Sequence, residues 1–163
     1  MSVHRLNHAV LYVHDARRAA EFYSTAFGFE TVVDAGGRAV FMRAPHSTND
    51  HDLGLFSVGG GDEPATSRSA TSRDDRRIGL YHLAWQVATI DDLVRLRTRL
   101  QDMGALTGES DHGVSKSLYG RDVDGIEFEV MWAVPREDWP EGVLTRRLDL
   151  DADVRRWAGV QTV

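Results

Sequence analysis

Two histidines and one glutamate, far apart in the chain, are residues of the types that could hold a metal ion together. His8, His82 and Glu129 each occupy an apolar, strand-like segment. Two imidazoles and a carboxylate are the ligand set of non-haem iron(II) sites, which leave one side of the metal open. The chain has no cysteine, so a metal would be held by nitrogen and oxygen atoms alone. These residues predict a metalloenzyme with redox chemistry.

The two histidines occupy the same place in a pattern that occurs twice. From position 8 to position 82 is 74 residues, and each histidine opens an apolar run, ending at Val13 or at Val87, before a helical pattern. Short β-type segments follow the helix in each half. We therefore expect an α+β fold in which two βαβββ modules form a cupped mixed sheet. A pseudo-two-fold axis between the modules would bring the histidines together.

Capping and turn residues set the boundaries of the expected elements. Asp15 is placed to cap one helix and Gly28 to end it, while Thr89 or Asp91 could cap a second helix that ends at Gly104. We expect a single domain, 1–163, whose parts are module 1 (about 3–58), a linker (about 59–77), module 2 (about 78–133) and a C-terminal tail (134–163). The apolar spacing in the tail predicts a helix, packed outside the sheet or on a second subunit.

The alternation of side chains in the last strand places its carboxylates away from the main core. Glu127 and Glu129 share one face, and the opposite face is wholly apolar: Ile126, Phe128, Val130 and Trp132. Burying an unpaired carboxylate would be costly, so the glutamate face is expected to be the wetter one. His82 likewise shares its strand face with Ala84 and Gln86. A nearby carboxylate would then complete a site with the two histidines.

Composition excludes several other classes of function. The net charge is −6, and basic residues alternate with acidic ones, so a nucleic-acid partner is not expected. No window approaches the roughly 20 apolar residues of a membrane span. A cytoplasmic protein is the simplest expectation. Exposed sheet edges and Trp157 in the tail make a homodimer plausible.

The turn before the last strand carries a resemblance to a known family. Residues 122–129, Asp-Val-Asp-Gly-Ile-Glu-Phe-Glu, resemble the Asp-Pro-Asp-Gly-Asn-x-x-Glu motif of the vicinal oxygen chelate superfamily, which includes glyoxalase I, bleomycin-resistance proteins and extradiol dioxygenases. In that motif the last glutamate binds metal, which implies this role for Glu129. Val123 and Ile126 depart from the motif and leave the ligand position occupied.

Within the superfamily, the chain is most similar to extradiol catechol 2,3-dioxygenases. The segments that carry this resemblance are 51–55, 111–122 and 134–140, and Tyr119 precedes Glu129 by the ten residues that the dioxygenase signature has. The resemblance implies an Fe(II) site (Mn(II) is an alternative) on His8, His82 and Glu129. It also implies an aromatic diol and O2 as substrates, and proton transfer or hydrogen bonding by a catalytic set: His51, His112 and Tyr119.

Two other readings remain open on the same scaffold. A glyoxalase-like isomerase or lyase would use a four-ligand nickel or zinc site, with a second glutamate near the end of the first module. The corresponding strand reads Gly-Leu-Phe-Ser at 54–57 and contains no carboxylate. A metal-free protein that sequesters an aromatic or drug-like ligand, as bleomycin-resistance proteins do, is the other alternative.

Overall fold

The computed structural model describes residues 5–58, 80–142 and 145–163, in two compact units that divide the chain at 67/68. The linker expected at 59–77 lies outside the described residues. Each unit contains its own four-stranded sheet and is described by itself. Over the described ranges, no helix combines the length and the apolar character that a bilayer crossing requires.

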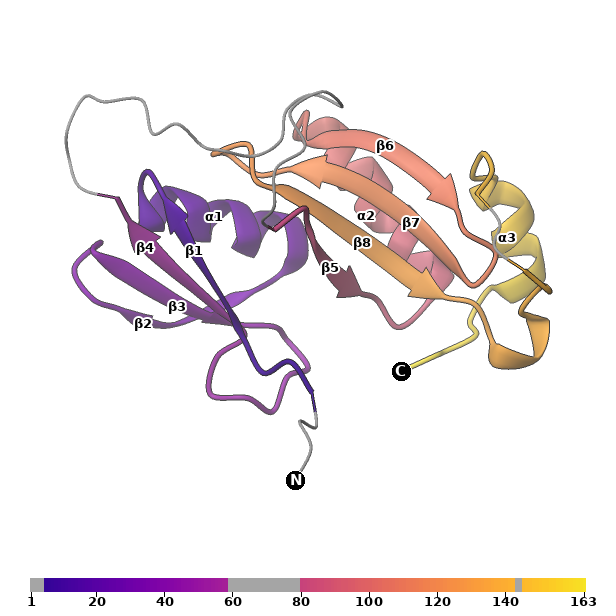
Figure 1. The fold of residues 1–163 in the computed structure, drawn as a ribbon, viewed down its shortest axis with the longest axis horizontal. Helices are drawn as coiled ribbons and strands as arrows, with labels where there is room; N and C mark the ends of the chain where they lie inside the picture. Colours follow the sequence, from indigo (N-terminus) through magenta and orange to yellow (C-terminus); the bar gives the residue numbers. More distant parts are fainter. Residues whose placement is uncertain (1–4, 59–79, 143–144) are drawn as a thin grey trace. The chain divides into compact units, whose positions relative to one another are not determined.

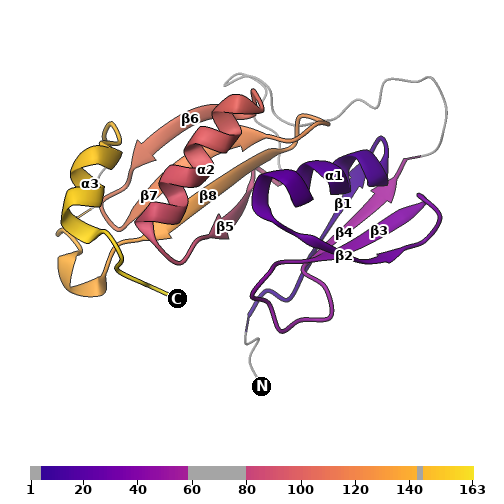
Figure 2. The same ribbon diagram turned by 180° about the vertical axis from the view of Figure 1, so that it is seen from behind.

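The first unit follows the order strand, helix and three strands (Figure 1). Its sheet order is β1-β4-β3-β2, in which β1 pairs with β4 in parallel and the other pairs are antiparallel. Helix α1 packs against β3 and β4, on one face of the sheet (Figure 2). The elements are β1 (Ala9–Val13), α1 (Ala16–Phe27), β2 (Glu30–Asp34), β3 (Ala39–Arg43) and β4 (Leu53–Ser57).

The second unit repeats this order and adds a tail. Its sheet order, β5-β8-β7-β6, again has one parallel pair, between β5 and β8. The elements are β5 (Leu83–Gln86), α2 (Ile90–Asp102), β6 (Leu106–Asp111), β7 (Ser115–Arg121), β8 (Glu127–Ala133), the 3-10 turn η1 (Arg136–Asp138) and α3 (Leu150–Trp157). The prediction of an α+β fold from two βαβββ modules is therefore confirmed (Figure 1).

Short-range signals start and end the first helix of each unit. The Asp15 carboxylate accepts hydrogen bonds from the backbone N–H groups of Arg17 and Arg18, and Gly28 ends α1 in the left-handed conformation at φ 76°. Thr89, one of the two predicted caps, accepts from the backbone N–H of Asp92 at the start of α2. Both helices therefore begin where the sequence predicted.

Each sheet has a covered face and a more open face. In β8, Phe128, Val130 and Trp132 are buried, whereas Glu127 and Glu129 are half-buried on the opposite side. The first unit follows the same rule: in β1, Leu11 and Val13 are buried, and Val10 and Tyr12 are exposed. The candidate ligands therefore lie on, or next to, the open faces, as the alternation predicted.

The C-terminal tail contacts the rest of the second unit through ion pairs of a buried lysine. Lys116, the chain's only lysine, is 2% exposed, and its Nζ lies 2.7 Å from Asp111 Oδ2 and 3.2 Å from Asp153 Oδ1 of α3. Trp157 packs on Trp132, with ring centroids 5.5 Å apart. The predicted terminal helix is present and packs on its own unit, against α2.

Candidate active site

His82 and Glu129 come together at the open face of the second unit. His82 immediately precedes β5, and Glu129 lies in the middle of β8, directly opposite Ala84 in the parallel ladder. This register brings His82 Nε2 to 3.1 Å from Glu129 Oε2, and the two side chains are 23% and 13% exposed. His82 Nδ1 is buried and has no hydrogen-bond partner within the described part of the chain.

This pair has a spacing that suits a divalent metal. A first-row ion holds nitrogen and oxygen ligands at about 2.0–2.2 Å, so two ligands at right angles lie about 3 Å apart. The observed 3.1 Å matches that spacing, and an imidazole with a carboxylate is a suitable donor set. Among residues 5–58, 80–142 and 145–163 no group of three such side chains is gathered tightly enough to hold an ion. His8, the third expected ligand, belongs to the first unit, so the full set stays a prediction.

Tyr119 and His112 lie beside this pair in the same unit. Tyr119 is directly opposite Glu129 in the β7–β8 ladder, and its ring centroid is 5.9 Å from that of His82. The Tyr119 hydroxyl is 2.8 Å from His112 Nε2, and His112 Nδ1 is 3.3 Å from Thr145 Oγ1. The second unit therefore brings together four of the six predicted site residues.

Burial and charge keep the Tyr119 phenol protonated. Burial, followed by the negative charge of Glu129, raises the pKa of Tyr119 from 10.0 to about 12. The neutral phenol can donate its proton in a hydrogen bond at physiological pH, and His112 Nε2 is placed to accept it. Tyr119 and His112 therefore form a hydrogen-bonded pair with an exchangeable proton next to the possible metal ligands.

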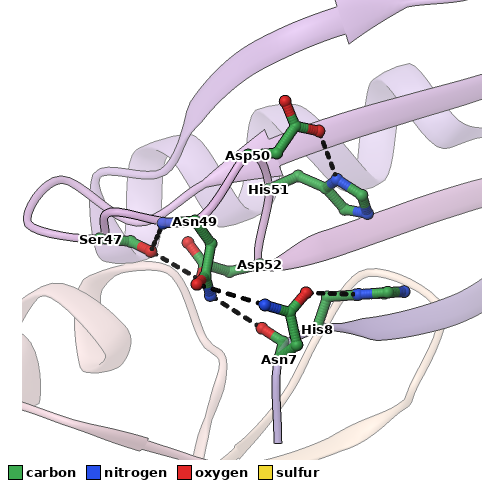
Figure 3. Close-up of polar contacts among 7 residues, drawn as sticks. All are labelled: Asn7, His8, Ser47, Asn49, Asp50, His51 and Asp52. Carbon is green, nitrogen blue, oxygen red and sulfur yellow. Dashed lines mark hydrogen bonds and ion pairs between the residues drawn. The ribbon is translucent and has the colours of Figure 1, made fainter.

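The first unit brings together the other two predicted residues, His8 and His51 (Figure 3). Their ring centroids are 4.6 Å apart, and the ring of Phe41 contacts His51 edge-on at 5.0 Å. His51 Nδ1 is 3.0 Å from Asp50 Oδ2, which leaves its Nε2 free of that carboxylate. His51 is half-buried, whereas Asp50 is exposed.

A polar network ties the loop that carries His51 to the start of β1. Asp52 accepts from the Ala44 backbone N–H at 2.9 Å, from Ser47 Oγ at 2.8 Å and from Asn49 Nδ2 at 2.7 Å. Burial alone would raise the pKa of Asp52, but these hydrogen bonds outweigh it and hold the pKa below 3.8. Asn49 also bonds to Asn7, the neighbour of His8 (Figure 3).

Sequence reasoning did not identify Asn7 and Asn49 as site residues. The signal that the sequence offered was Asn7 directly before a candidate ligand histidine. Its partner Asn49 is 42 positions away, and only the folded loop brings the two amides together.

The register also locates the first-unit counterpart of Glu129. Glu129 pairs with Ala84, two residues after His82, and Gly54 pairs with Val10, two residues after His8. Gly54 therefore occupies the position that Glu129 has in the second unit. The first unit therefore has a histidine at the equivalent place in its sheet, with a glycine where the second unit has the glutamate.

Comparisons with known proteins agree with this architecture. The sequence profile of the Glyoxalase/Bleomycin resistance protein/Dioxygenase superfamily matches residues 5–130. The chain belongs to this superfamily. The resemblance found in the sequence is thus confirmed at the level of the family.

Individual relatives within the superfamily differ in function. The chain is 28% identical over 137 residues to biphenyl-2,3-diol 1,2-dioxygenase 3 of Rhodococcus globerulus, covering 82% of this chain and 67% of that protein. A glyoxylase/bleomycin resistance protein/dioxygenase domain from Frankia sp. EAN1pec has a TM-score of 0.66 at 24% identity, covering 83% of this chain and 96% of that one. Lactoylglutathione lyase from Agrobacterium tumefaciens has a TM-score of 0.57 at 22% identity, covering 80% and 95%. The two structures show a shared fold.

Proposed function

We propose that this chain is an Fe(II)-dependent extradiol dioxygenase that opens the ring of a catechol-type aromatic diol. The observation that carries the proposal is the side-chain cluster of the second unit, His82, Glu129, Tyr119 and His112. It combines metal-ligand spacing with a proton donor and acceptor on one sheet face. The relative from Rhodococcus globerulus, named as a dioxygenase of biphenyl-2,3-diol, supports the same class of substrate.

In this proposal His8, His82 and Glu129 hold the metal. Iron(II), when bound, would supply the electron-transfer chemistry with O2 that amino-acid side chains lack. The neutral imidazoles and the ionised carboxylate reduce the dipositive charge to a net single positive charge. Mn(II) suits the same nitrogen and oxygen donors and is the alternative ion. One diol and one O2 give a ring-opened product that retains both oxygen atoms, so no external reductant is consumed.

The remaining residues would manage protons. His51 Nε2, on the far side of the ring from Asp50, is the atom placed to accept a proton from a diol hydroxyl. Tyr119 keeps its proton because its pKa is about 12, and its hydroxyl can turn this proton from His112 Nε2 to an oxygen atom of the substrate. This arrangement provides one acid-base group from the first unit and a coupled pair from the second.

The competing enzymatic reading is a glyoxalase-like isomerase or lyase. The chain shares its fold with a lactoylglutathione lyase, so this scaffold also fits an isomerase or lyase. Its four-ligand site needs a first-module carboxylate, and Gly54 stands at the counterpart of Glu129. A metal-free ligand-binding protein would have no use for a half-buried imidazole and carboxylate at 3.1 Å. Both observations favour the open three-ligand site.

The test is anaerobic loading with Fe(II), measurement of bound iron, and then addition of catechol or biphenyl-2,3-diol with O2. We expect one equivalent of iron, uptake of O2 and a yellow ring-fission product. Glu129→Gln should lower both iron affinity and turnover by at least about 100-fold, because it removes a charged ligand. Glu127→Gln is the matched control. Glu127 lies on the same face of β8, and its Oε2 is 3.8 Å from Nη2 of Arg121. It should retain both properties.

The alternatives predict different results in the same experiment. A chain that binds no iron would favour the sequestering protein. A chain that binds iron or nickel but takes up no O2 with any diol would favour the isomerase. Equal losses in the two glutamine variants would contradict the assignment of Glu129 as the ligand.

A further inference from the structure

Asn7 lies between His8 and the loop of residues 44–52 and makes contact with both (Figure 3). Its side-chain Oδ1 is 2.9 Å from His8 Nδ1, and its Nδ2 is 3.3 Å from Asn49 Oδ1. Asn49 Nδ2 bonds to the Asn7 backbone carbonyl at 2.9 Å. Two asparagines therefore connect a candidate ligand to a loop about 40 residues away.

The orientation of the Asn49 amide follows from the groups that surround it. Asp52, when ionised, can only accept hydrogen bonds, and so can the carbonyl of Asn7. Both lie within 2.9 Å of the same Asn49 atom, which must be the nitrogen, because an oxygen there would face two acceptors. The opposite Asn49 atom is then the oxygen, and Arg5, an obligatory donor, contacts it.

The orientation of Asn7 follows in turn. Its side-chain atom that faces Asn49 Oδ1 has to be a donor, so it is Nδ2. The atom that faces His8 is then Oδ1, which can only accept, and Nδ1 of the imidazole has to carry the proton. The neutral ring with a proton on Nδ1 has its lone pair on Nε2.

We propose that Asn7, oriented by Asn49 and Asp52, is a positioning residue that fixes His8 in the Nδ1–H tautomer and presents its Nε2 lone pair to the metal. The inference rests on the proposed function in one respect, that His8 is a metal ligand. Outer partners of ligand histidines set the tautomer and ring orientation, and their loss typically lowers metal affinity or activity by about 10–100-fold. Here the partner is an amide whose own direction is set by a carboxylate two hydrogen bonds away.

The same network has a second consequence for His51. Asp52 joins the loop to both neighbouring strands, because its backbone carbonyl accepts from Ala9 N–H and its backbone N–H donates to the Met42 carbonyl. His51 is the preceding residue, and its ring packs on that of His8 at 4.6 Å. The hydrogen-bonded chain from Asp52 through Asn49 to Asn7, called the relay below, therefore sets the orientation of the His8 ring and the position of the His51 ring.

The first measurement uses the metal-free, 15N-labelled protein, in which long-range 1H–15N correlations of His8 distinguish the two neutral tautomers. We expect the Nδ1–H form in the wild type. Asn7→Leu, which has similar size and no acceptor, should populate the Nε2–H form. Asn7→Asp, which keeps an acceptor for Nδ1, should retain the Nδ1–H form, and this rescue separates the acceptor role from packing.

The second measurement is Fe(II) affinity under anaerobic conditions, with circular dichroism as the check on folding. Asn7→Leu should weaken binding by about 10–100-fold, and Asn7→Asp should retain it within about threefold. Arg5→Ala is the matched control, because it removes a contact of Asn49 Oδ1 and leaves the chain from Asp52 to His8 intact. It should change neither the tautomer nor the affinity.

The variants distinguish failure of this inference from failure of the proposed function. If His8→Ala binds Fe(II) as tightly as the wild type, His8 is not a ligand and the iron site as proposed is wrong. If His8→Ala loses affinity but Asn7→Leu keeps both the tautomer and the affinity, the relay is wrong and the iron site stands. If Asn7→Leu fails to fold, Asn49→Leu provides the same test, because it frees the Asn7 amide to turn.

Discussion

The two units of this protein have the same fold but differ in the residues that cross their open faces. At equivalent register positions the first unit has Val10, Gly54 and Phe41, and the second has Ala84, Glu129 and Tyr119, as the two ladders pair them. The first row has no polar side chain, whereas the second has a carboxylate and a phenol. Both units keep the histidine that precedes the first strand.

The surroundings of the two histidines differ in the same way. His8 has a neighbour, Asn7, that contacts its Nδ1, and the residue at the equivalent place before His82 is Tyr81, whose ring centroid lies 4.7 Å from that of His82. His82 instead contacts Glu129 through Nε2. A repeated fold therefore provides two equivalent histidine positions whose neighbours differ: an asparagine amide in the first unit, and a carboxylate and a phenol in the second.

The largest expected effect concerns a buried charge that the second unit contains. Lys116→Met removes the cation between Asp111 and Asp153 and should lower the free energy of unfolding by about 3 kcal/mol, since Asp153 is left buried without its ion-pair partner and Asp111 keeps only Arg146. All four tryptophans lie in the second unit, so their fluorescence during urea unfolding reports on it: Trp85, Trp132, Trp139 and Trp157.

The control for this prediction comes from the first unit. Arg17 pairs with Asp34 at 2.7 Å, and the two side chains are 63% and 35% exposed. Exposed pairs typically contribute less than about 1 kcal/mol, so Arg17→Met should have a small effect, measured by circular dichroism. Equal effects of the two substitutions would show that burial of Lys116 does not distinguish the units.

The next prediction concerns the aromatic residue at one register position, which is Tyr119 in the second unit and Phe41 in the first. Tyr119→Phe gives the second unit the side chain that Phe41 provides in the first, and it removes the phenol next to His112. The kcat for ring cleavage should fall by about 100-fold, the lower range for loss of a general acid or base. Iron affinity should change less than about threefold, because Tyr119 is not a proposed ligand.

The reciprocal substitution is the control. Phe41→Tyr adds a hydroxyl to the first unit, where Phe41 contacts the His51 ring. It should lower kcat by less than about threefold, since it removes no proton donor. If Tyr119→Phe is as active as the wild type, the phenol has no part in the reaction, and the comparison of the two rows would need another explanation.

Local signals account for what the sequence predicted. The caps at Asp15 and Thr89 and the left-handed Gly28 depend on a few neighbouring residues, so their effects can be read from spacing. The match of the two halves predicted the repeated topology. The alternation in β8 predicted that Glu129 faces away from the core, since successive side chains point to opposite faces.

Long-range pairing accounts for what the sequence did not predict. The equivalence of Gly54 and Glu129 depends on strand register, and both modules have a register shift in their outer hairpins, at Thr31/Val33 and at Leu106/Gly108. The contact of Asn7 with Asn49 requires the folded loop. The burial of Lys116 requires the tail, because its partner Asp153 belongs to α3. None of these is a property of neighbouring residues.

The smallest expected effect tests whether the first unit keeps the proposed metal site open. Gly54 is not in the left-handed region, and a Cβ there would lie 3.4 Å from Val10 Cγ2 and 3.6 Å from Phe41, so a side chain can be accommodated with small shifts. Gly54→Glu would place a carboxylate at the counterpart of Glu129. An added anionic ligand should raise Fe(II) affinity by about tenfold and lower O2 uptake by a similar factor, because it occupies a position that the substrates need.

Gly54→Gln is the matched control, since it has the same size and a much weaker ligand. It should obstruct the site to the same degree, and turnover should fall without a gain in affinity, measured by anaerobic Fe(II) titration of both variants. A gain in affinity with glutamate alone means that the first-unit row lies within reach of the metal and that the glycine there favours the open, three-ligand form. Equal affinities for the two variants would place Gly54 away from the metal, and the glycine in the first row would then say nothing about oxygen chemistry.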